Sequence, residues 1–116
     1  MGRNNALAVY DLWRHLPERP RAVLVYMALI SLDYDSDRDD TDARVYFGGH
    51  VQIANALGLN SDLEMPTPGH LRMVRRYIDQ LRAAGAVVRV QRAKNHRHAI
   101  YRLRLEPVDK PPPEPP

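Results

Sequence analysis

Apolar positions recur at helical spacing through the first third of the chain and predict two helices there. The first covers residues 5–16, and the second covers residues 19–33, beginning at residue 19 or 20. The middle of the second helix, residues 23–30, is apolar on all sides, and a helix of this kind is buried on every face. We expect it at the centre of the core, with a spare face that pairs with a second copy of the chain if the domain is too small to surround it.

A short strand and a third helix are predicted next. Residues 44–47 are β-branched and aromatic, which favours a strand. Residues 50–59 have the apolar spacing of a helix, and Gly58 is suited to end it. Residues 60–66 are predicted to form the loop that follows.

The next helix is the most amphipathic element of the chain. We predict it over residues 68–84, with Thr67 as N-cap, Pro68 in the first helical position and Gly85 after its end. On a helical wheel, the apolar face consists of Leu71, Val74, Ile78 and Leu81. The opposite face carries Arg72, Met73, Arg76, Gln80 and Ala83, with Arg75, Tyr77 and Arg82 on the flanks.

A hairpin is predicted near the end of the chain. Residues 87–92 and 100–105 each alternate apolar and polar side chains, which is the pattern of a strand with one buried face. The side chains that we expect to face the core are Val88, Val90, Tyr101, Leu103 and Leu105. Two helices, a strand, two further helices and a hairpin make an α+β domain, which we place at residues 1–106.

The charge of the chain is unevenly distributed. The net charge is +3, but residues 1–43 hold five Lys/Arg and eight Asp/Glu, residues 44–105 hold eleven and three, and residues 106–116 hold one and three. The positive charge therefore lies on the last two helices and the hairpin. Clustering of this kind indicates a phosphate-binding face. Fifteen of the basic residues are Arg, which can form forked hydrogen bonds to phosphate or guanine.

Three segments together resemble the winged-helix superfamily of DNA-binding domains. They are Gln52-Ile-Ala-Asn-Ala-Leu-Gly-Leu59, Leu81-Arg-Ala-Ala-Gly-Ala-Val87 and the basic hairpin. The phrase Val45-Tyr-Phe-Gly-Gly49, with the leading pair of helices, is similar to small winged-helix proteins of actinobacterial phages and plasmids. The loop over residues 60–66 is longer than the turn of a simple helix-turn-helix, which leaves open whether residues 61–65 also contact DNA.

The resemblance implies a recognition helix in the major groove and a wing, residues 92–98, on the DNA backbone or in the minor groove. The expected base-reading residues are Arg72, Met73, Arg76 and Gln80. The expected backbone contacts are Thr67, His70, Arg75, Arg82, Arg92, Lys94, His96 and Arg97.

We expect a phage- or plasmid-type transcription regulator that binds double-stranded DNA as a homodimer through helices 5–16 and 19–33. Two alternatives stay open: the origin-binding domain of a replication initiator, and a winged-helix adaptor that binds proteins and not DNA. A catalytic role is not expected, because the chain has no phosphate loop, nucleophile elbow or metalloprotease motif.

Two segments have residues that are typical of metal sites, but neither has a complete set of ligands. The acidic loop, residues 33–43, lacks the Gly and Glu that a calcium-binding EF-hand loop needs in either register, and His96-Arg-His98 has no evident third ligand. We therefore expect no metal, cofactor or catalytic residue. The absence of cysteine fits a reducing compartment. With no membrane-length apolar run and no signal-peptide pattern, we expect the cytoplasm of a bacterial host cell.

The chain ends in a segment rich in proline. Five of the nine residues from Val108 to Pro116 are proline, which favours an extended polyproline-like conformation. We expect residues 107–116 to be a disordered tail, which could offer a docking segment to a protein partner.

Overall fold

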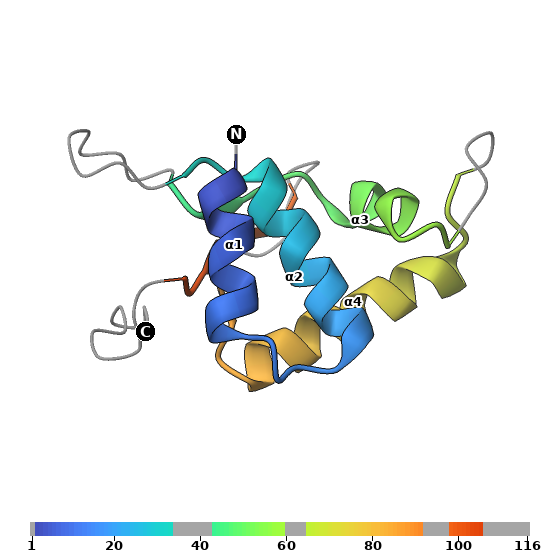
Figure 1. Cartoon of the computed structure of the whole chain (residues 1–116). Helices are drawn as coiled ribbons and strands as arrows, with labels where there is room; N and C mark the ends of the chain where they lie inside the picture. Colours follow the sequence, from blue (N-terminus) through green and yellow to red (C-terminus); the bar gives the residue numbers. More distant parts are fainter. Residues whose placement is uncertain (1, 34–42, 60–64, 92–97, 106–116) are drawn as a thin grey trace.

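The computed structural model describes residues 2–33, 43–59, 65–91 and 98–105. Within these ranges, four helices and a three-stranded antiparallel sheet form an α+β fold (Figure 1). The elements are α1 (Arg3–Leu12), α2 (Glu18–Ile30), β1 (Val45–Tyr46), α3 (His50–Ala56), α4 (Pro68–Ala83), β2 (Val87–Gln91) and β3 (Ile100–Leu103). The predicted class and the predicted order of elements are confirmed.

Helix α2 is the central helix, as its apolar middle predicts. It contacts α1, α3, α4 and β1, and Figure 1 shows α1 and α2 side by side in opposite directions with α4 crossing them. Its fully buried side chains are Val23, Leu24, Met27 and Ala28. The prediction of burial on every face is wrong for its last turn, where Leu29 and Ile30 are 47% and 42% exposed.

Helix α1 begins earlier and ends earlier than predicted. The chain leaves helical geometry at Trp13, where φ is −126° and ψ is 18°, so the helix stops at Leu12. The indole N–H of Trp13 donates a hydrogen bond to the carbonyl of Arg104, at 2.8 Å. This contact joins the end of α1 to the residue just beyond β3.

The start of α1 is hydrogen-bonded to the end of α2 through polar groups. The buried Asn5 amide donates to the Ser31 hydroxyl at 2.9 Å and to the Leu32 carbonyl at 2.8 Å. The Asp33 carboxylate accepts hydrogen bonds from the backbone N–H groups of Asn4 and Asn5, at 3.3 and 2.9 Å. A carboxylate at this position satisfies N–H groups that have no partner inside the helix and favours its positive end.

The sheet has the order β1-β3-β2, so β3 is the central strand. Val45 of β1 lies opposite Arg102, and Val87 of β2 lies opposite Leu103, both in antiparallel register. The side chains of Tyr101, Leu103 and Leu105 are buried, as the alternation predicts. Because β3 has a partner on both sides, it holds the hairpin and the early strand together.

The predicted inner face of β2 is wrong. Val87 is buried, and Arg89 lies directly opposite the buried Tyr101, so these positions share the inner face. Val88 is only partly buried, and Val90 is 38% exposed. The side chains alternate from Val87 to Val90 in the opposite phase to the predicted one, because Val87 and not Val88 pairs with the buried Leu103. A register irregularity follows Arg89 and falls at Val90.

Helices α3 and α4 are each followed, two residues after their last helical residue, by a glycine in the left-handed conformation. The φ angles are 70° at Gly58 and 82° at Gly85. After α4, the N–H of Ala86 donates to the carbonyl of Leu81 at 2.9 Å, which is the longer bond of a Schellman motif. The predicted glycine ends are therefore confirmed, although α3 itself stops at Ala56.

Most of two predicted segments lies outside the described residues. They are the acidic loop 33–43, of which the structure describes only Asp33 and Ala43, and the tail 107–116. Among the helices that are described, none combines the length and the apolar content needed to cross a membrane.

Candidate nucleic-acid interface

Helix α4 begins with a capping box. The Thr67 hydroxyl accepts a hydrogen bond from the His70 backbone N–H at 3.2 Å, and the His70 Nδ1 accepts one from the Thr67 N–H at 3.2 Å. Pro68 stands in the first turn, where its missing N–H costs nothing. Both predicted backbone contacts at this helix start are thus already hydrogen-bonded to each other.

One face of α4 anchors the helix to the core. Val74, Ile78 and Leu81 are fully buried, and Leu71 is half-buried. Burying a side chain of this kind contributes about 1.5–3 kcal/mol. The predicted core face is confirmed, and it fixes which side chains of the helix face outward.

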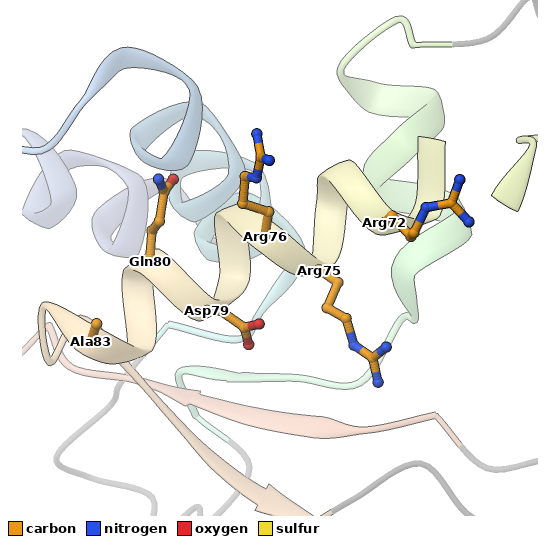
Figure 2. A pocket seen from close by; sticks show the side chains of 6 residues that line it. All are labelled: Arg72, Arg75, Arg76, Asp79, Gln80 and Ala83. Atoms are coloured by element: carbon orange, nitrogen blue, oxygen red, sulfur yellow. The ribbon is translucent and has the colours of Figure 1, made fainter. Parts of the chain in front are cut away.

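The outward face of α4 carries the predicted base-reading side chains. Arg72, Met73, Arg76 and Gln80 are all exposed. A shallow hollow of about 470 Å³ lies along this helix, lined by Arg72, Arg75, Arg76, Asp79, Gln80 and Ala83 (Figure 2). Met73 does not line it. Figure 2 shows Arg76 and Gln80 on one side of the helix, and Arg75 and Asp79 on the side where the strands run.

Asp79 is an acidic residue in this basic helix, and it had no predicted role. Its Oδ1 lies 3.4 Å from a guanidinium nitrogen of Arg82, and the two side chains are 59% and 36% exposed. An exposed ion pair of this kind contributes about 0.2–1 kcal/mol. Arg82 is therefore held only weakly and can exchange Asp79 for a stronger anionic partner.

A second, more enclosed groove of about 260 Å³ lies between α4 and the hairpin. Its lining residues are His50, Arg75, Ile78, Asp79, Arg82, Arg89, Ala99 and Tyr101. We call this the helix–hairpin groove. Arg89 was not predicted here, because the predicted phase of β2 placed it outside. His50 had no predicted role, and Tyr101 was predicted only as a core residue.

A histidine–tyrosine pair lies within the helix–hairpin groove. The His50 Nε2 is 3.1 Å from the Tyr101 hydroxyl, and the two rings stack with centroids 6.1 Å apart. Burial lowers the pKa of His50 from its ordinary value, and the positive charges of Arg75 and His98 lower it further, against the opposing effect of Asp79. Burial raises the pKa of Tyr101.

The predicted contacts divide into two groups in the structure. Those on α4 and at its start are described and lie along one helix: Thr67, His70, Arg72, Met73, Arg75, Arg76, Gln80 and Arg82. Those at the hairpin tip lie outside the described residues: Arg92, Lys94, His96 and Arg97. The tip therefore stays a prediction.

Comparison with family models, with curated proteins and with solved structures found no match to this chain. The fold and the side chains that α4, β2 and β3 place together are therefore the basis for a functional proposal.

Proposed function

We propose that this chain is a winged-helix protein that binds double-stranded DNA, with α4 in the major groove and the hairpin β2–β3 beside it as the wing. Three structural facts support the proposal. The order of helix, strand, two helices and hairpin is the order expected of a winged helix. Strands β1 and β2 flank β3 in one sheet. Helix α4 is anchored to the core by a buried face.

The observation that carries the proposal is the exposed row Arg72, Arg76 and Gln80. These residues are one turn apart, so their Cα atoms are separated by about 6 Å along the helix. The major groove is about 12 Å wide and admits one helix; in it Arg pairs with guanine and Gln with adenine. A core-anchored helix with such a row can present hydrogen-bond donors to successive base edges.

The proposal is tested by binding to mixed genomic DNA and then to sequences selected from random DNA. Affinity should fall with salt by roughly 0.9 log units per log unit of salt for each phosphate contact. Arg76→Ala should cost about 1–3 kcal/mol on the preferred sequence and much less on unrelated DNA. Arg19→Ala, an exposed arginine in the first turn of α2, is the matched control and should change little.

Two results contradict parts of this proposal. If the chain does not bind DNA at low salt, the DNA-binding proposal is wrong. The alternative of a winged-helix adaptor that binds proteins is then favoured. If Arg76→Ala weakens all sequences equally, Arg76 contacts phosphate and does not read a base.

A homodimer through α1 and α2 belongs to the same proposal, because a small regulator gains affinity from two half-sites. Leu7 and Tyr10 of α1 are each 54% exposed, and Leu29 and Ile30 of α2 are also exposed. These apolar side chains are candidates for the contact with a second copy. Sedimentation at micromolar concentration measures the mass, and a monomer there contradicts the dimer.

The biological role that we propose for this chain is transcription regulation of the phage or plasmid type.

A further inference from the structure

The helix–hairpin groove gathers cationic side chains from two separate elements. Arg75 and Arg82 come from α4 and Arg89 comes from β2, while Asp79 is the one carboxylate among the described residues that line it. Its volume, about 260 Å³, is below the roughly 300–1,000 Å³ of typical small-molecule sites. The size suits a single charged group and not a whole nucleotide.

Arginine is the side chain best suited to grip an oxyanion, because its planar fork offers parallel N–H donors. Arg82 and Arg89 line the groove from its helix side and its strand side. The weak 3.4 Å pair between Arg82 and Asp79 does not hold Arg82 against a stronger partner. In the part of the chain that the structure describes, three arginines and one aspartate give the groove a net positive charge, which favours binding of an anion.

The His50–Tyr101 pair adds polar groups to the same groove. Their ring nitrogen and hydroxyl are 3.1 Å apart, and Tyr101 is almost fully buried. His50 faces Arg75, Asp79 and Arg82 from α4, Arg89 from β2, and Tyr101 from β3, with His98 nearby. Because burial and the positive neighbours lower the pKa of His50, the groove favours its neutral form. An anion among these arginines offsets their charge and favours the protonated form.

We propose that the helix–hairpin groove binds one phosphate group between Arg82 and Arg89, and that His50 takes up a proton on binding. The DNA backbone of the proposed function or a free phosphate can supply this group. The site itself rests on the geometry of the groove and stands without DNA.

The first test is a titration of the full chain with inorganic phosphate. Binding is monitored by calorimetry or by the NMR resonances of the arginine side chains. Arg89→Ala should weaken binding roughly tenfold, the loss expected for one charge-assisted hydrogen bond. Arg102→Ala is the matched control, because Arg102 pairs with Val88 on the other face of the same hairpin, and it should leave the affinity unchanged. Asp79→Asn should tighten binding, since it removes a like charge and releases Arg82.

The two directions of change guard against a folding artefact. Loss of binding in Arg89→Ala could follow from a damaged hairpin, but a tighter site in Asp79→Asn could not. If Arg89→Ala and Arg102→Ala weaken binding equally, or if Asp79→Asn does not tighten it, the groove is not a phosphate site.

The second test concerns the proton. Sulfate does not titrate near neutral pH, so it replaces phosphate as the probe between pH 5 and pH 8. The pKa of His50, followed by its ring resonances, should rise when sulfate is bound, and affinity should increase as the pH falls. His50→Gln should abolish this pH dependence, whereas His98→Gln should retain it. An unchanged pKa of His50 with sulfate bound overturns the proton uptake.

A third comparison identifies the source of the phosphate. If Arg89→Ala weakens DNA binding uniformly across sequences and lowers the salt slope by about 0.9, the DNA backbone occupies the groove. If phosphate binding is lost and DNA binding is unchanged, the occupant is a free phosphate. Phosphate binding in a chain that binds no DNA refutes the proposed function and supports this site. DNA binding in a chain whose groove fails the first test refutes this site alone.

Discussion

Replacing Asn5 with alanine tests whether the polar contact between α1 and α2 stabilises the fold. The change removes two hydrogen bonds, from the Asn5 amide to the Ser31 hydroxyl at 2.9 Å and to the Leu32 carbonyl at 2.8 Å. Each contributes about 0.5–1.5 kcal/mol net. The Ser31 hydroxyl still donates to the Ala28 carbonyl, and the Leu32 carbonyl still accepts from the Arg44 N–H, so neither group is left wholly unsatisfied. We expect a loss of about 1–3 kcal/mol.

Urea denaturation monitored by the fluorescence of Trp13 measures this loss. A double-mutant cycle with Ser31→Ala should give a coupling energy of about 0.5–1.5 kcal/mol, because the two side chains share one hydrogen bond. Asp33→Asn is the matched control, since its oxygen can still accept from the backbone N–H of Asn5 while the negative charge is lost. A loss below about 0.5 kcal/mol for Asn5→Ala, or strict additivity in the cycle, would refute this account.

Two further measurements address α4 and the helix–hairpin groove. Thr67→Ala removes the N-cap acceptor of α4 and should lower the free energy of unfolding by about 1 kcal/mol in urea; no loss would contradict the capping box. The lowered pKa of His50 makes the unfolded chain bind a proton that the folded chain does not. In buffer without phosphate or sulfate, stability should therefore fall as the pH drops through the ordinary His value of about 6.5 and level off below the folded pKa. His50→Gln should reduce this fall, and an equal fall in both proteins would contradict the assignment.

The helices and their ends were largely predictable from the sequence, because their signals are local. Thr67 and Pro68 mark the start of α4, Gly85 marks its end, and the spacing of Val74 and Ile78 sets its buried face. Each of these signals acts within a turn or two of the helix. None needs a partner from elsewhere in the chain.

The face of β2 could not be predicted in the same way. Alternation gives two phases, and the choice between them depends on which residue lies opposite Tyr101 in β3. Arg89 pairs with Tyr101 and takes the inner face, so Val90 takes the outer face. The role of Arg89 therefore became visible only with the pairing of the strands.

Asn5 shows the same limit for a polar residue. At a helix start, asparagine is normally an exposed cap, and no local pattern predicts that Asn5 is buried. Its partners, Ser31 and Leu32, lie at and just beyond the end of α2. Only the packing of α1 against α2 brings them within hydrogen-bond distance of Asn5. The positive face of α4 was predictable in composition, while the groove beside it was not.

The central position of β3 has a consequence for synthesis and truncation. Val45 in β1 must wait for Arg102, about half the chain later, before it can pair, and β2 also pairs only with β3. On a ribosome, the helices can therefore emerge and collapse together while both edge strands still lack their neighbour. A chain that stops before Ile100 loses a whole sheet and not merely one strand, and the loss reaches back to the segment that leads into α3.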